Sequence, residues 1–214
     1  MIEGVLFDLD GILVDTEPLH CRTYIKALAN HGIHITEEFY FDFWTRQGKG
    51  IKEYVREYAN GLDPLEVRDE KLELYFKALR EDIPIIEGAP ECLEALSAQF
   101  PLGLVTGSLQ CSADLVLELT EFRRYFNGIV VTADDVTHQK PHPEALLLAA
   151  EKLKLAPSKI AYVGDAQKDF QAAHAAGMNC VAIPTTLTAD NDFSLATTIL
   201  SSIKELTPEY VRSL

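Results

Sequence analysis

Short apolar runs alternate with amphipathic stretches along most of the chain. The runs end at polar or glycine positions and are too short for helices, which is typical of buried strands in a parallel sheet. They predict strands at residues 4–7, 102–105 and 160–163, with weaker candidates at 129–131 and 180–183. Between them, apolar residues recur at helical spacing, for example at Ala89, Leu93 and Leu96. This alternation predicts an α/β fold, with a parallel sheet covered by helices on both faces.

One long segment breaks the alternation of strands and helices. Between about residues 16 and 85 only helical periodicity is visible, as in the set Cys21, Tyr24, Ile25 and Leu28. Glycines and a proline divide the segment into several helices. We therefore expect an α/β core formed by residues 1–15 and 86–214, with an all-helical domain, residues 16–85, inserted into it.

Composition and charge narrow the classes of partner. The chain has 214 residues, of which 47% are hydrophobic and 24% charged, and these values indicate a folded globular protein. Its net charge is −14, with a sequence pI near 4.8. Nucleic acids and anionic membranes attract basic surfaces, so neither is expected to be a partner of this chain.

The cysteines and the first residues bear on where the protein acts. Cys21, Cys92, Cys111 and Cys180 are far apart and form no metal-binding or redox pair, which favours buried free thiols in a reducing compartment. The N-terminus carries Glu3 and lacks a signal-peptide pattern. We expect a cytoplasmic protein, with a monomer as the simplest assembly.

Candidate chemistry begins at the end of the first predicted strand. In Asp8-Leu9-Asp10-Gly11 the acids are two residues apart, so in an extended chain both side chains point to the carboxyl edge of the sheet. Open α/β sheets bind ligands at this edge. The two carboxylates repel each other, and a divalent cation such as Mg²⁺ is the simplest way to keep both ionised. Taken alone, the same residues are explained equally well by an Asp-Gly turn with a helix cap.

Two other predicted strands also end in polar residues. Thr106-Gly107-Ser108 follows the strand at 102–105, where a hydroxyl and backbone N–H groups could hold a phosphoryl oxygen or cap the next helix. Asp165 follows the strand at 160–163, and Asp169 lies one helical turn later. This pair suits either a metal ion or the positive end of a helix dipole.

A lysine stands in a proline-containing loop, Gln139-Lys140-Pro141-His142-Pro143-Glu144. The prolines restrict the backbone and would help to aim the ammonium group of Lys140, although a lone lysine is more often a solvated surface charge. His142 and the other histidines show no metal-ligand spacing, so we expect them to be structural or exposed.

Taken in order, these motifs resemble those of the haloacid dehalogenase superfamily of phosphotransferases. They are Asp8-Leu9-Asp10-Gly11, Thr106, Lys140 and Gly164-Asp165 with Asp169. The inserted helical domain is similar to the small cap of the subfamily that contains phosphoglycolate phosphatase and β-phosphoglucomutase. The resemblance implies a Rossmann-like core with the first strand central, and a cap formed by residues 16–85. Asp10 favours phosphoryl transfer, because the dehalogenases of this superfamily lack that second acid.

The resemblance also implies catalytic and metal-binding roles. Asp8 would be the nucleophile that forms an aspartyl-phosphate, and Asp10 the general acid and base. Mg²⁺ would be held by Asp8, by the backbone carbonyl of Asp10 and by Asp165. Lys140 would offset the charge of Asp8 and the phosphoryl group. Asp169 would orient Lys140 or a water at the metal, although direct ligation is also compatible with its position.

Two further sets of residues are candidates for substrate binding, the first implied by the resemblance and the second by its position in the insertion. Thr106, Gly107 and Ser108 would hold the phosphoryl oxygens. Four polar residues of the insertion could meet the rest of the substrate, although roles at helix ends and on the surface explain them as well; these are Glu17, His20, Arg46 and Lys49.

Three functions fit this set of residues. The first is a Mg²⁺-dependent phosphatase acting on a small phosphorylated metabolite, such as a sugar phosphate or phosphoglycolate. The second is a phosphomutase of the β-phosphoglucomutase type, although such mutases more often carry Glu-Asp in place of Gly164-Asp165. The third is a noncatalytic, phosphorylatable switch resembling receiver domains, but these are shorter and lack the inserted helices.

Overall fold

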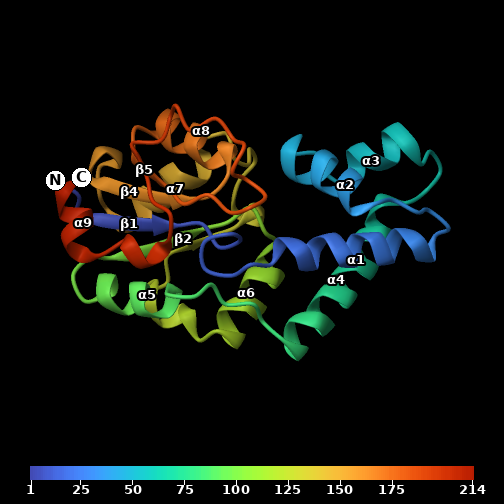
Figure 1. Cartoon of the computed structure of the whole chain (residues 1–214), viewed down its shortest axis with the longest axis horizontal. Helices are drawn as coiled ribbons and strands as arrows, with labels where there is room; N and C mark the ends of the chain where they lie inside the picture. The colour runs from blue at the N-terminus through green and yellow to red at the C-terminus, as the bar shows by residue number, and fades with distance from the viewer. The chain divides into compact units, whose positions relative to one another are not determined.

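A six-stranded parallel sheet organises the larger part of the chain (Figure 1). The computed structural model describes residues 1–214. The strand order is β3-β2-β1-β4-β5-β6. The strands are β1 Gly4–Phe7, β2 Leu102–Val105, β3 Val130–Val131, β4 Ile160–Gly164, β5 Asn179–Ala182 and β6 Thr198–Ile199. The predicted α/β fold is confirmed, and β1 lies between β2 and β4 as expected.

Helices cover both faces of the sheet, which explains why the central strands are continuously apolar. Every residue of β1, β2 and β4 is buried. In Figure 1, α5 and α6 lie on one side of the sheet and α7 and α8 on the other. These helices are α5 Ala89–Ser97, α6 Gln110–Leu119, α7 Glu144–Leu153 and α8 Gln167–Ala176, and the chain ends with α9 Pro208–Ser213.

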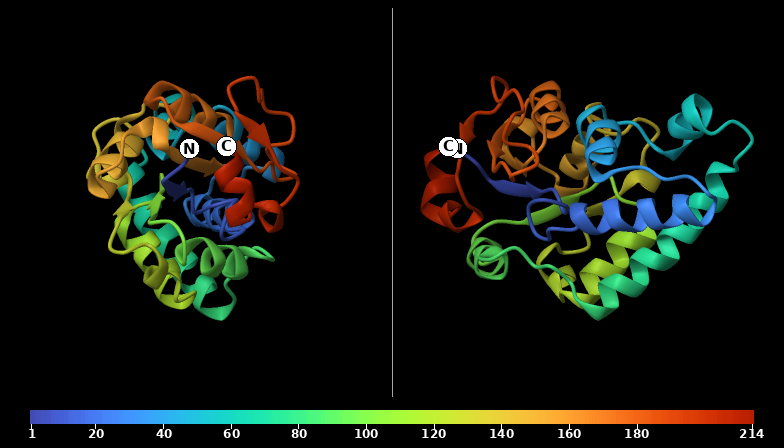
Figure 2. Two further views of the ribbon diagram at one scale, coloured as in Figure 1. Left: turned by 90° about the vertical axis from the view of Figure 1, so that its left-hand side faces the viewer. Right: turned by 45° about the vertical axis from the view of Figure 1, so that its right-hand side comes forward.

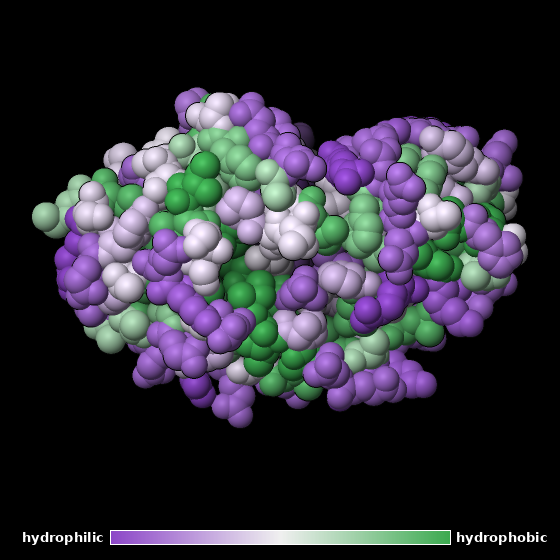
Figure 3. All heavy atoms as spheres, in the orientation of Figure 1, coloured by the Kyte–Doolittle hydropathy of each residue, from purple (hydrophilic) through white to green (hydrophobic).

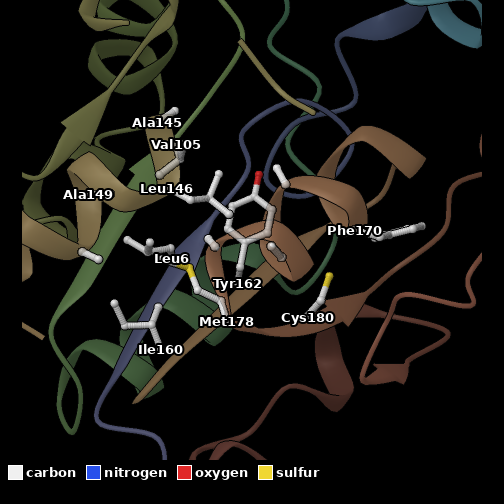
Figure 4. Packing of buried hydrophobic residues seen from close by; sticks show 14 of the residues in the cluster. Leu6, Val105, Ala145, Leu146, Ala149, Ile160, Tyr162, Phe170, Met178 and Cys180 are labelled. Atoms are coloured by element: carbon white, nitrogen blue, oxygen red, sulfur yellow. The ribbon is translucent and has the colours of Figure 1, made fainter. Parts of the chain in front are cut away.

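The main hydrophobic cluster of the core surrounds the ring of Tyr162, as Figure 4 shows. Leu6 of β1, Leu146 of α7 and Phe170 of α8 belong to it, and all three are fully buried. The phenolic oxygen of Tyr162 is the polar end of an otherwise apolar residue. A buried hydroxyl of this kind needs a hydrogen-bond partner.

The structure corrects several details of the sequence interpretation. The edge strand β6 was not expected, because it has only two residues and Ile199 is 54% exposed. The strand expected at 180–183 begins one residue earlier, and the strand expected at 129–131 is shorter. Cys111 is exposed, so the expectation that all four thiols are buried was wrong for this residue.

The chain forms two compact units. The first comprises Met1–Asp15 and Pro84–Leu214, and the second, which we call the helical unit, comprises Thr16–Ile83. Its helices are α1 Glu17–Asn30, α2 Glu37–Tyr40, a π-helical segment Phe41–Arg46, α3 Ile51–Tyr58 and α4 Pro64–Glu81. Helices α1 and α4 pack against each other. On the face shown in Figure 3, hydrophilic and hydrophobic residues are interspersed over this unit.

The two chain segments that connect the units lie side by side within the α/β core. The N–H of Asp15 donates to the carbonyl of Pro84 at 2.8 Å, and the N–H of Ile86 donates to the carbonyl of Leu13 at 3.0 Å. The chain therefore leaves and re-enters the core at one place. The two termini also lie together, near the start of β1 (Figures 1 and 2). No helix of the structure has the length and apolar character needed to cross a membrane.

Candidate active site

The carboxylate of Asp8 lies at the carboxyl end of the central strand. The N–H of Asp8 still donates to Val163 of β4 at 2.9 Å, so the residue is held in line with the sheet. Its Oδ1 accepts the N–H of Leu9 at 2.8 Å, and its Oδ2 lies 2.9 Å from Nζ of Lys140. Asp8 is only 4% exposed. These contacts orient a buried carboxylate that still carries unused lone pairs.

Lys140 is drawn into the core from the loop before α7. Its side chain is 4% exposed, and Nζ lies 2.7 Å from Oδ1 of Asp169 and 2.9 Å from the hydroxyl of Tyr162. Burial alone would lower the pKa of Lys140, but Asp169 and Asp8 outweigh it and hold this pKa above the usual value. Lys140 is therefore a buried, charged group between two carboxylates. The alternative interpretation of Lys140 as a solvated surface charge is excluded.

Tyr162 and Asp169 hold this lysine in place. The Tyr162 hydroxyl donates to Oδ1 of Asp169 at 2.9 Å, and Oδ2 of Asp169 accepts the N–H of Ala166 at 3.1 Å. Asp169 thus caps α8 and anchors Lys140 at the same time. Burial would raise the pKa of Asp169, but Lys140 and Lys168 hold it below the usual value. Sequence reasoning missed Tyr162. The only signal in the sequence was a side chain with a hydroxyl group among the apolar residues of a buried strand.

Asp165 is the third buried acid at this edge of the sheet, at 8% exposure. The hydroxyl of Thr188, which sequence reasoning also missed, lies 3.4 Å from its Oδ2. Gly11 approaches the same carboxylate: a Cβ atom at this glycine would lie 2.6 Å from Cγ of Asp165. Gly11 also has a φ of 82°, so both its backbone and its neighbour require glycine.

Asp8, Asp165 and Asp169 together can hold a metal ion. Each offers a carboxylate oxygen, and these atoms lie within 4.8 Å of one another. Burial raises the pKa of Asp8. Burial and the nearby charge of Asp169 raise the pKa of Asp165. Lys140 therefore does not compensate the negative charge of the three carboxylates. An all-oxygen, buried and under-compensated donor set fits a hard divalent cation such as Mg²⁺.

Asp10 lies beside the residues that follow β2. Its Oδ2 accepts the hydroxyl of Ser108 at 2.9 Å, with the Thr106 hydroxyl at 3.5 Å. The N–H of Ser108 donates to Oγ1 of Thr106 at 3.0 Å, and Gly107 between them is exposed. The structure therefore brings together the first two sequence motifs. The carboxylate of Asp10 is not in the group of three acids, and the predicted metal contact through its backbone carbonyl stays a prediction.

The four polar candidates of the insertion belong to the helical unit and have partners within it. Glu17 accepts the Thr45 hydroxyl at 2.6 Å. The ring of His20 stacks on Tyr75, with centroids 4.2 Å apart. Arg46 pairs with Asp42 at 4.0 Å, and Lys49 pairs with Glu57 at 2.9 Å. Their predicted contact with substrate stays a prediction.

A family model for haloacid dehalogenase-like hydrolases matches residues 5–183 of this chain. The chain therefore belongs to this family, and it is a phosphatase of the family. The phosphorylated carbohydrates phosphatase of Thermotoga maritima is 31% identical over 183 residues, which cover 83% of this chain and 82% of that protein. The phosphoglycolate phosphatase of Escherichia coli is 30% identical over 232 aligned positions, covering 97% of this chain and 92% of the relative.

A solved structure shares the whole architecture. The crystal structure of CbbY from Rhodobacter sphaeroides in complex with phosphate covers 100% of both chains, with a TM-score of 0.89 and 25% sequence identity. The predicted resemblance to the haloacid dehalogenase superfamily is thus confirmed over the sheet and the inserted helices alike.

Proposed function

We propose that this phosphatase requires Mg²⁺ and hydrolyses phosphate monoesters of small metabolites, such as sugar phosphates or phosphoglycolate, through an aspartyl-phosphate on Asp8. The observation that carries the proposal is the arrangement of Asp8 at the end of β1, with Lys140 at 2.9 Å and Asp165 and Asp169 beside it. The substrates that name the relatives from Thermotoga maritima and Escherichia coli support the substrate class.

In the first half-reaction, a carboxylate oxygen of Asp8 forms a bond to phosphorus while the bond from phosphorus to the substrate oxygen breaks. Asp10 gives its proton to the departing alkoxide, which leaves as an alcohol. In the second half-reaction, Asp10 takes a proton from water as the water oxygen attacks phosphorus. Phosphate is released and the Asp8 carboxylate is regenerated.

The other residues of the site position charge around this reaction. Lys140 holds one oxygen of Asp8 and offsets the charge of the incoming phosphoryl group. Thr106 and Gly107 lie at the end of β2, from where a hydroxyl and a backbone N–H can hold phosphoryl oxygens. Mg²⁺, held by Asp8 and Asp165, would neutralise part of the charge on the transferred group. Asp169 already accepts hydrogen bonds from Lys140, Tyr162 and Ala166, which supports a role in orienting Lys140.

The helical unit would act as a cap that closes over the site and excludes water. The hydrogen bonds between Asp15 and Pro84 and between Ile86 and Leu13 support this proposal, because two neighbouring connecting segments can flex as one hinge. The residues of the unit that could contact the substrate are Glu17, His20, Arg46 and Lys49.

The test is phosphate release from a panel of phosphorylated metabolites, with and without EDTA. We expect release from several small sugar phosphates or from phosphoglycolate, its loss in EDTA, and its recovery when Mg²⁺ is restored. Turnover that EDTA leaves undiminished would contradict the metal requirement. With β-glucose 1-phosphate, conversion to glucose 6-phosphate without release of phosphate would identify a phosphomutase instead.

Replacing Gly11 by alanine should disturb the metal-binding acid directly. The new Cβ would lie 2.6 Å from Asp165, so this carboxylate must move, and we expect Mg²⁺ affinity to fall by about 10-fold or more. The matched control is Gly177→Ala, since Gly177 has a similar φ of 73° but no atom within 4 Å of its Cβ position. Both variants should lose about 1–2 kcal/mol of stability through the left-handed backbone. Equal Mg²⁺ affinities, measured by titration, would contradict the steric role of Gly11.

A further inference from the structure

A second group of potential metal ligands lies in the loop that carries Lys140. His138, His142 and Glu144 each offer one ligand atom, and these atoms lie within 4.8 Å of one another. Both histidines are exposed and Glu144 is half-buried. The exposure of both histidines was one of the two expected alternatives; their proximity to Glu144 comes from the fold of the loop and was not visible in their sequence spacing.

The carboxylate of Glu144 is already oriented. Its Oε1 accepts the N–H of Thr137 at 2.8 Å, and its Oε2 accepts the N–H of His138 at 3.0 Å. The bond from Thr137, with those from His138, holds the pKa of Glu144 below its usual value. Hydrogen bonds behind a ligand carboxylate are the usual support of a metal site. Oε1 retains a lone pair for a cation, and Oε2 regains one when the ring proton of His138 leaves Nδ1.

The two imidazole rings face this carboxylate. Nδ1 of His138 lies 2.9 Å and Nδ1 of His142 lies 3.8 Å from Oε2 of Glu144. Ligand atoms on one tetrahedral zinc ion lie about 3.3 Å apart, a value between these two distances. The N–H of Glu144 donates to Nδ1 of His142 at 3.3 Å, so this nitrogen carries a lone pair, the form in which imidazole binds metals.

We propose that His138, His142 and Glu144 bind one divalent transition-metal ion of the Zn²⁺ class, with water completing its coordination. Two nitrogen donors and one oxygen favour such an ion over Mg²⁺, which prefers oxygen ligands alone. On binding, the ring proton of His138 moves from Nδ1 to Nε2 through solvent, and the ion replaces the long hydrogen bond at His142. The three ligands lie on both sides of Lys140 in the sequence, so the ion joins the two ends of the loop that positions this lysine.

The experiment is a Zn²⁺ titration by calorimetry in excess Mg²⁺, in the wild type and in an Asp165→Asn background that weakens binding at the aspartates. We expect one Zn²⁺ per chain in both. His138→Ala and His142→Ala should each lower the Zn²⁺ affinity about tenfold or more, because even the loss of a residue that only supports a metal ligand costs this much. His174→Ala, which removes another exposed histidine of the core, is the matched control and should leave the affinity unchanged.

Two outcomes would overturn the metal site. One is that Asp165→Asn removes all Zn²⁺ binding; the other is that the double variant of His138 and His142 binds Zn²⁺ as the wild type does. Visible absorption of bound Co²⁺ gives a second readout, because the nitrogen ligands change its spectrum and the double variant should lose this change. The phosphatase proposal rests on other residues, so neither outcome would contradict it.

Discussion

Replacing Asp8 by asparagine is expected to abolish turnover, with a fall in kcat on the order of 10⁴-fold or more, as for other catalytic nucleophiles. The amide cannot form the bond to phosphorus that the carboxylate forms. Phosphate release in the presence of Mg²⁺ measures the effect. Asp190→Asn is the matched control, because it makes the same chemical change at an exposed acid of the core.

The same Asp8→Asn variant should fold normally. Burial raises the pKa of Asp8, which means that the surroundings disfavour its charged form when no metal is present. A neutral side chain of nearly the same shape removes that cost, and Lys140 keeps Asp169 as a partner at 2.7 Å. The denaturation midpoint in EDTA should therefore match or exceed that of the wild type. Wild-type turnover by a folded Asp8→Asn protein would rule out the aspartyl-phosphate.

Replacing Lys140 by methionine should reduce both activity and stability. We expect kcat to fall on the order of 10²–10³-fold, the range found when one preorganised electrostatic contact to the transition state is removed. In the absence of metal, Asp8 and Asp169 then lose the ammonium group that contacts both of them, and breaking a buried ion pair costs about 3–5 kcal/mol. Steady-state kinetics and urea denaturation measure the two effects.

Metal dependence separates the role of Lys140 from a general defect in folding. Saturating Mg²⁺ should restore part of the stability of Lys140→Met, because the cation supplies positive charge to the same carboxylates. Lys152→Met removes an exposed lysine from α7 and should change neither property. If Lys140→Met were as stable as the wild type in EDTA, the buried charge cluster would not have the energetics inferred from its contacts.

The two substitutions thus make opposite predictions for the metal-free protein. Removing a negative charge at Asp8 relieves repulsion, whereas removing the positive charge at Lys140 increases it. Both variants are expected to lose activity. A pair of stability measurements in EDTA therefore tests the electrostatics of the site independently of catalysis.

The sequence alone was sufficient to predict the main strands and where the acids lie. Strands buried on both faces must be continuously apolar, so β1, β2 and β4 are visible as short apolar runs, and the residues that follow them must share one edge of a parallel sheet. This reasoning placed Asp8, Thr106 and Asp165 together. It did not find β6, whose two edge residues bury too little surface to leave a pattern.

Only the tertiary structure decided which side chains support those acids. The hydroxyl of Tyr162 reaches Lys140 and Asp169, and Thr188 reaches Asp165, from segments that local patterns mark only as core or loop. The approach of His138 and His142 to Glu144 likewise depends on the fold of one loop. Periodicity records which face of an element avoids water, but a contact between two side chains depends on the backbone path of both, which residue spacing does not record.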